Sequence, residues 1–498
     1  MILIKNVQIV DGSGQKPFRG DILIDKNKIS AIRPVIDKKA DEVFDGLGLT
    51  AVPGFIDVNT NSDHYLSLFT YPSQKDFLMQ GVTTIVGGQC GASLAPLMYG
   101  SLVSIRKWAK SDLINVGWNK VSEFLDALRR IKIGINFATL VGHSTIRRDI
   151  VGEQIRDLTQ SELDVFSKIL EESFQEGAAG MSTGLAYIHS RSTPYSEIKT
   201  FVKLAAKHNK LYATHLRDEK NDLLRSAEET IGIAQETGAR TIITHFRPFR
   251  GLEPQFEQAL ALIDQSLAKA NVYFDVNPFG KSIAAIYALL PEWAQNGGIE
   301  VMLSHLLNEN TRQKITEELS QKDFGDYAVG AAIGQERLVG KRLKDLANDR
   351  GKTVTEILLE LMVNTKLRGK LTLEDLNTEI VENKLLFHPR ALIGSNSASL
   401  PEKIQDLVKM ERANQTFSRY LDIAASRNLP LEETIKKITA TAAQVAGIKN
   451  RGLLKEKYMA DVTLLKDNKV TDVLVNGKFA VRNSELTDEL AGDVLQTV

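Results

Sequence analysis

Cys90, His215 and His245 each stand at the end of a short apolar segment, and Cys90 is the only cysteine among 498 residues. One thiolate and two imidazoles suit zinc, and three protein donors with an open fourth position are typical of catalytic zinc. Such a zinc lowers the pKa of a bound water toward about 7 and polarises a carbonyl, as the hydrolysis of an amide or ester requires. In the competing interpretation, Cys90 is a small apolar core residue and each histidine only bonds backbone. The combination favours a site for one zinc ion.

These residues belong to a longer series of polar side chains that follow eight apolar runs. The runs alternate with amphipathic helical patterns, which is typical of parallel βα units. They are residues 52–57, 82–86, 134–141, 178–184, 211–215, 240–245, 271–276 and 391–396. Eight such units predict an α/β fold, a (β/α)8 TIM barrel, in which the C-terminal ends of the strands carry the chemistry. We therefore expect the side chains that follow the runs to meet at one mouth of the barrel.

The two ends of the chain predict short strands instead of barrel units. Residues 1–52 and 448–498 contain strand patterns, with hairpin chemistry at 25–28 and at Asn476-Gly477. Neither end can build a core alone, so we expect them to close on each other as a small β-sandwich domain. The barrel domain then spans residues 53–447, with a helical insertion at about 280–385, because that gap is too long for a loop.

Composition excludes several classes of protein. Lys plus Arg and Asp plus Glu both total 62, so the net charge of zero offers no field for nucleic acid or an anionic membrane. No apolar stretch has the length of a membrane span. A single cysteine excludes a disulfide within the chain, and the first residues predict a strand where a secretory signal would be continuously apolar. We expect a cytoplasmic protein that acts on a small molecule; its oligomeric state stays open.

Several motifs resemble the D-aminoacylase (N-acyl-D-amino-acid deacylase) branch of the amidohydrolases. They occur in that family's order and extend over nearly the whole chain; they are PGFID at 53–57, GQCGASLAPL at 88–97, LVGH at 140–143, STGL at 182–185, ATHLR at 213–217 and IGSN at 393–396. The resemblance implies a TIM barrel with a β-sandwich built from both termini. It also implies zinc on Cys90, His215 and His245, and removal of an N-acyl group from a D-amino acid.

The chain departs from this family at three positions. The family's His-x-His after the first strand is here Asn59-Thr60-Asn61, and the aspartate after the eighth strand is Asn396. Because an amide oxygen is a poor zinc ligand, a second metal position at these residues should be abolished or very weak. The resemblance implies that the aspartate acts as general base, and an amide cannot take up that proton. Loss of a general base typically costs about 10² to 10⁴ in rate.

The resemblance also implies residues that contact the substrate. Arg247, two residues beyond His245, stands where the family has a basic residue for the substrate carboxylate, and the guanidinium fork suits that ligand. A surface arginine is the alternative. Ser182, Thr183 and Tyr187 follow the fourth strand and are expected to line the pocket. His143 matches a histidine that lines the family's active site, with a purely structural histidine as the alternative.

Two hypotheses follow for the function. The first is a zinc-dependent hydrolase of non-peptide C–N bonds that deacylates an N-acyl-D-amino acid or a related amide, with Arg247 binding the carboxylate. The second is a catalytically silent relative that keeps one zinc and acts by ligand binding or as a scaffold. One-zinc hydrolysis needs only an open metal position and a proton acceptor, so the sequence favours the enzyme.

Overall fold

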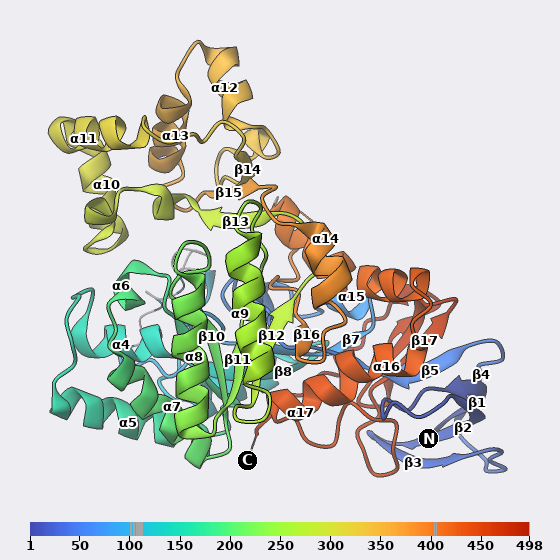
Figure 1. Cartoon of the computed structure of the whole chain (residues 1–498). Coiled ribbons are helices and arrows are strands. Elements are labelled where there is room, and N and C mark those ends of the chain that lie inside the picture. The colour runs from blue at the N-terminus through green and yellow to red at the C-terminus, as the bar shows by residue number, and fades with distance from the viewer. Residues whose placement is uncertain (100–101, 103–104, 106–112, 403, 405, 498) are drawn as a thin grey trace.

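Eight parallel strands form a nearly closed barrel at the centre of the molecule (Figure 1). The computed structural model describes residues 1–498 except 100–101, 103–104, 106–112, 403, 405 and 498. The barrel strands are β6 (Phe55–Asp57), β7 (Val82–Gly87), β8 (Asn136–Gly142), β9 (Gly180–Gly184), β10 (Leu211–His215), β11 (Arg240–Ile243), β12 (Val272–Val276) and β16 (Ala391–Ile393). They neighbour one another in chain order, so the predicted α/β barrel is confirmed.

The barrel closes just beyond the ends of its first and last strands. The N–H of Asn396 donates to the Asn59 carbonyl at 2.8 Å, and Thr60 and Ser397 form a parallel bridge. The run 52–57 is divided at Gly54, where a Cβ would lie 2.2 Å from the Thr83 hydroxyl oxygen. Residues before Gly54 therefore join another sheet, and only Phe55–Asp57 enters the barrel.

Helices cover the outside of the barrel and bury apolar faces against it. Among the described residues they are α1 (Ser67–Thr70), α2 (Lys75–Leu78), α3 (Val121–Ile131), α4 (His143–Val151), α5 (Gln160–Gln175), α6 (Ile188–Arg191), α7 (Tyr195–Lys207), α8 (Leu223–Thr237), α9 (Glu253–Gln265), α15 (Leu407–Ser426), α16 (Leu431–Lys436), the π-helix η7 (Lys437–Thr441) and α17 (Ala442–Ala446). The capping box of Thr159 and Glu162 at the start of α5 is present, and Gly447 ends α17 with a φ of 73°. In the part of the chain that the structure describes, no helix has the length and apolarity needed to cross a membrane.

Strands from both chain ends form one nine-stranded mixed sheet beside the barrel. They are β1 (Ile2–Ile9), β2 (Phe18–Asp25), β3 (Lys28–Arg33), β4 (Glu42–Asp45), β5 (Thr50–Pro53), β17 (Val462–Lys466), β18 (Lys469–Val475), β19 (Lys478–Arg482) and β20 (Glu485–Leu486). The two ends join through antiparallel pairing of β5 with β17. The Asn476-Gly477 turn has positive φ at both residues, 48° and 78°, as a type I′ hairpin requires.

The segment between β12 and β16 rises from the mouth of the barrel as a lobe of its own (yellow to orange in Figure 1). It contains a three-stranded sheet and its own apolar core. Its elements are β13 (Ser282–Ala285), η3 (Ile286–Leu289), η4 (Glu292–Gln295), α10 (Gly298–Leu307), α11 (Glu309–Leu319), β14 (Ala328–Ala331), η5 (Glu336–Leu338), α12 (Leu343–Arg350), α13 (Val354–Asn364) and β15 (Lys370–Leu373), followed by α14 (Thr378–Ile380) and the π-helix η6 (Val381–Leu385) on the way back to β16. Buried Lys370 ties this lobe to the barrel, because its ammonium donates to Asp406 at 2.9 Å.

Candidate metal centre

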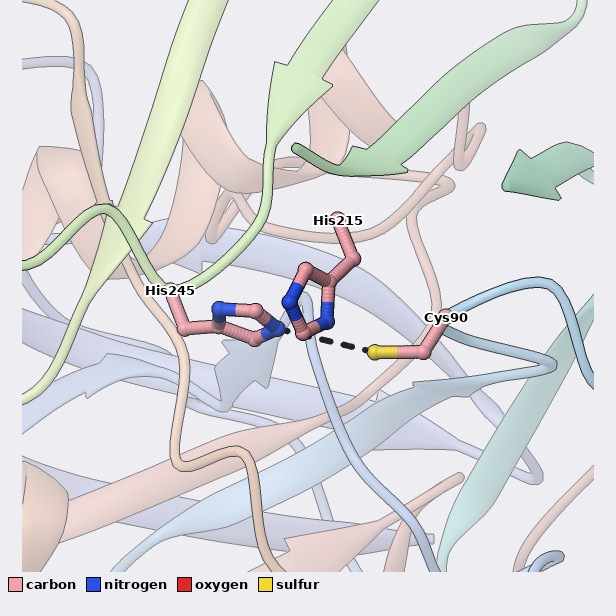
Figure 2. Close-up of side chains that lie close together, drawn as sticks. All are labelled: Cys90, His215 and His245. Carbon is pink, nitrogen blue, oxygen red and sulfur yellow. Dashed lines mark hydrogen bonds between the residues drawn. The ribbon is translucent and has the colours of Figure 1, made fainter. Parts of the chain in front are cut away.

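Cys90, His215 and His245 come together at the mouth of the barrel (Figure 2). Cys90 follows β7, His215 is the last residue of β10, and His245 follows β11. One donor atom from each side chain lies within 4.8 Å of the other two. Cys90 Sγ is 3.6 Å from His245 Nε2, and the two imidazole centroids are 4.3 Å apart with an interplanar angle of 81°. Three strand ends far apart in sequence thus supply one group of donors.

This donor set fits a zinc ion in chemistry, and its cysteine is held as a thiolate. Burial alone would raise the pKa of the Cys90 thiol, but hydrogen bonds and positive charge from His215 and His245 hold it well below its usual value. The thiolate is the form of cysteine that binds metal. His215 Nδ1 is buried without a hydrogen-bond partner among the described residues. An orphaned ring nitrogen beside a thiolate is the kind of polar atom that a metal ion satisfies.

Glu219 orients both histidines from the loop after β10. One carboxylate oxygen is 2.9 Å from His245 Nδ1, and the other is 3.4 Å from His215 Nε2 and 2.5 Å from the guanidinium of Arg247. Burial alone would raise the pKa of Glu219, but Arg247 and the two histidines hold it well below its usual value. Burial likewise opposes the charged form of His245, yet Glu219 and the Cys90 thiolate raise its pKa to about 9. A carboxylate behind a metal-binding imidazole fixes ring orientation and increases basicity.

The backbone at two of the three donors is left-handed. Cys90 has φ 53° and His245 has φ 42°, a conformation that costs non-glycine residues energy and is typical of functional sites. Ser182 holds the loop of Cys90 in place, because its Oγ accepts the Gly91 N–H at 3.0 Å and donates to the Gly88 carbonyl. Contacts from neighbouring strands therefore stabilise the turn that aims the thiolate into the mouth.

The amides of Asn59, Asn61 and Asn396 stand at the same mouth. Asn59 Nδ2 donates to Asp275 at 3.0 Å, while the Asn61 side-chain oxygen accepts the ammonium of Lys409 at 2.6 Å. Asn396 has φ 47°, and its carbonyl also accepts from Lys409. Within the described ranges, Cys90, His215 and His245 are the one group of at least three His, Cys, Asp or Glu side chains spaced for a metal ion.

Comparison with known proteins finds relatives that match nearly the whole chain. No protein-family model matches it. It is 29% identical to the D-aminoacylase of Alcaligenes xylosoxydans xylosoxydans, over 99% of this chain and 97% of that one. The chain is therefore similar to the D-aminoacylases over nearly its whole length. The zinc- and phosphonate-bound structure of N-acyl-D-glutamate deacylase from Bordetella bronchiseptica shares the fold, with a TM-score of 0.82, 24% identity and coverage of 99% of both chains. A D-aminoacylase structure described by its binuclear metal centre has a TM-score of 0.81, also with 24% identity and 99% coverage of both chains.

Two of the residues expected to contact substrate lie next to the side chains of the candidate metal site. The ring of Tyr187 is 5.4 Å from that of His215, and the side chain of Arg247, 13% exposed, pairs with Glu219. A carboxylate of the substrate would therefore share Arg247 with Glu219. The expectation that Arg247 binds substrate stays a prediction.

The other expected residues have structural partners. Ser182 is engaged with the Cys90 loop, and Thr183 Oγ1 bonds the hydroxyls of Tyr212 at 3.0 Å and Thr214 at 2.8 Å. His143 Nε2 is 2.9 Å from Glu197, and its ring stacks on Phe166. These contacts place His143 and Thr183 in the packed interior of the barrel. A role in the reaction stays a prediction for both residues.

Sequence reasoning raises Glu219 only as one of several carboxylates near the mouth that could replace the missing base, with a solvated loop charge as the favoured interpretation, and it gives no role to Lys409; both residues touch the site. A signal for Glu219 existed, since it follows His215 by four residues and lies in the polar loop after a barrel strand. No sequence signal marked Lys409, which reaches the mouth from α15, 348 residues beyond Asn61.

Proposed function

We propose that this D-aminoacylase relative is a zinc-dependent amidohydrolase that removes the acyl group from an N-acyl-D-amino acid or a related amide. The observation that carries the proposal is the convergence of Cys90, His215 and His245 at the mouth of the barrel. Support for the substrate class comes from the relative that matches over nearly the full length, a D-aminoacylase.

Each residue of the site has a defined part in this proposal. Cys90, His215 and His245 would hold zinc, which supplies a Lewis acid that polarises the scissile carbonyl and makes water more acidic. Glu219 fixes the two imidazoles through its hydrogen bond with His245 and its 3.4 Å contact with His215. Arg247, paired with Glu219 at the mouth, receives the substrate carboxylate through its planar fork.

Asn396 limits the rate of the proposed reaction. Its neutral amide stands where the family resemblance implies a general base, and an amide accepts no proton near neutral pH. Loss of a general base typically costs about 10² to 10⁴ in rate. We therefore expect a slow hydrolase.

The same observation favours a second candidate. A chain with amides at positions 59, 61 and 396, but with its zinc donors in place, could keep one ion and bind an acylated amino acid without turning it over. This silent protein shares the zinc site with the enzyme and differs from it only in turnover.

Two measurements test the proposal. Metal analysis of the purified chain should give about one zinc per chain; Cys90→Ala and His215→Ala should give none. His208→Ala, which removes a histidine paired with Glu171 on the outer surface, is the matched control and should keep its zinc. A natural chain free of zinc after purification with added zinc would refute both candidates.

Turnover then separates the enzyme from the silent protein. A panel of N-acyl-D-amino acids and their L-enantiomers should be compared between the natural chain and the variant Asn59→His, Asn61→His, Asn396→Asp. Slow turnover of D-substrates by the natural chain supports the enzyme. An inert natural chain with an active variant supports the silent protein, and inactivity of both would refute the substrate class.

A further inference from the structure

The amino group of Lys409 lies in the mouth of the barrel between two of the three asparagines. Lys409 belongs to α15, its side chain is 2% exposed, and its Nζ donates to Asn61 Oδ1 at 2.6 Å and to the Asn396 carbonyl. The family resemblance places ligands of a second metal ion at positions 61 and 396. A lysine nitrogen thus lies between the two positions that would share that ion.

We propose that Lys409 takes the place of the second metal ion, so that the chain binds one ion where a structurally similar D-aminoacylase is described by a binuclear centre. This inference deepens the proposed function, because it fixes the metal content of the same site. It also accounts for the neutral amide at position 61, whose side-chain oxygen accepts a hydrogen bond from an amine instead of ligating a cation.

Geometry makes the two occupants mutually exclusive. A zinc ion binds oxygen and nitrogen ligands at about 2.0 to 2.2 Å, so an ion held by position 61 would lie within the volume that the Lys409 nitrogen fills at 2.6 Å from Asn61 Oδ1. The nitrogen excludes the ion by its size whether or not it carries a proton. When protonated, it also repels a divalent cation.

The Asn59 amide has a different partner. Its Nδ2, a hydrogen-bond donor, contacts Asp275 at 3.0 Å, and a donor cannot ligate a metal, whereas its Oδ1 is buried without a hydrogen-bond partner among the described residues. A lone amide oxygen is a poor zinc ligand, so with the Lys409 nitrogen at Asn61 the second position does not fit a metal ion.

A buried network holds Lys409 in this place. Its backbone N–H donates to Asp406 Oδ1 at 3.2 Å, and the other oxygen of Asp406 accepts from Tyr65 at 2.9 Å and from Lys370 at 2.9 Å. Lys370 comes from β15 of the inserted lobe. The start of α15, and with it Lys409, is thus fixed from both the barrel and the lobe.

Metal stoichiometry tests the proposal without any need for a substrate. Zinc per chain should be measured after dialysis against excess zinc for the natural chain, for the variant Asn59→His, Asn61→His, Asn396→Asp, and for that variant with Lys409→Met added. We expect one ion in the first two proteins and two in the third. Adding Lys370→Met instead is the matched control, since Lys370 is a second buried lysine that pairs with Asp406, and it should leave the count at one.

Two results would overturn the proposal. One is a second ion in the Asn59→His, Asn61→His, Asn396→Asp variant while Lys409 is present, and the other is no gain when Lys409 is removed from a variant whose circular dichroism shows it folded. Titration of the natural chain with zinc tests the exclusion even if a variant does not fold, because a second ion bound in its barrel would contradict it. If the proposed zinc site is wrong, the zinc count per chain falls by the same amount in every protein. If this inference is wrong, the difference in zinc count between the variants changes instead.

Discussion

Glu219→Gln is the substitution that most directly tests how the centre is organised. In the structure one carboxylate serves three partners: His245 at 2.9 Å, His215 at 3.4 Å and Arg247 at 2.5 Å. Glutamine keeps the size of the side chain and removes its charge. The substitution should therefore weaken zinc binding, through the histidines, and also lower stability, through Arg247.

The two effects have different magnitudes. Loss of a partner behind a metal-binding histidine typically weakens metal affinity by about 10- to 100-fold, which is about 1.4 to 2.7 kcal/mol. Breaking a fully buried ion pair costs about 3 to 5 kcal/mol, because one charge stays buried alone. Arg247 and Glu219 are 13% and 16% exposed, so solvent screens the remaining charge and we expect about 2 kcal/mol.

A double-mutant cycle separates the two effects. Zinc affinity is measured by competition with a chromophoric chelator, and the free energy of unfolding of the metal-free proteins by urea denaturation. Arg247→Met added to Glu219→Gln should recover most of the lost stability and none of the lost affinity. Glu229→Gln is the control, since Glu229 is 15% exposed and pairs with Arg217 at 2.6 Å. A zinc affinity of Glu219→Gln within twofold of the natural chain would refute the assigned role of Glu219.

Three further outcomes are expected. Cys90→Ala should release the zinc, because two imidazoles alone bind it weakly; metal analysis showing an unchanged zinc content would contradict the site. Asn396→Asp should raise the turnover of the substrate by about 10²- to 10⁴-fold if a carboxylate there accepts a proton, and equal steady-state rates would argue against it. Lys437 donates to the carbonyls of His388 at 2.6 Å and Ala391 at 3.1 Å, yet burial lowers its pKa from 10.5 to about 8. Between these values the unfolded chain binds the proton that the folded chain has lost, so stability should rise with pH in this window. Thermal melts of Lys437→Met at pH 7.5 and 9.5 should lack this gain, and a pH response parallel to that of the natural chain would contradict it.

Much of the fold could be predicted because its signals are local. Each of the eight apolar runs overlaps a barrel strand, and the Asn476-Gly477 hairpin and the Thr159 capping box form as their residue types predict. The bounds of the first strand were harder to predict, because the residues of its run that precede Gly54 belong to a different sheet. That division depends on the close approach of Thr83 to Gly54, a contact between two segments that no local pattern records.

For the site, the sequence alone determined which donors exist and at which strand ends they stand. Parallel strands in a barrel deliver their C-terminal ends to one mouth, so Cys90, His215 and His245 could be grouped before any distance was known. Only the tertiary structure decided what surrounds them. The contacts of Glu219 with both imidazoles and of Lys409 with Asn61 join segments whose separation and rotamers are set by packing of the whole domain. Sequence spacing places Glu219 four residues after His215, but it carries no information about the contacts of Glu219 with His245 and of Lys409 with Asn61, because these depend on where separate elements of the chain come to rest.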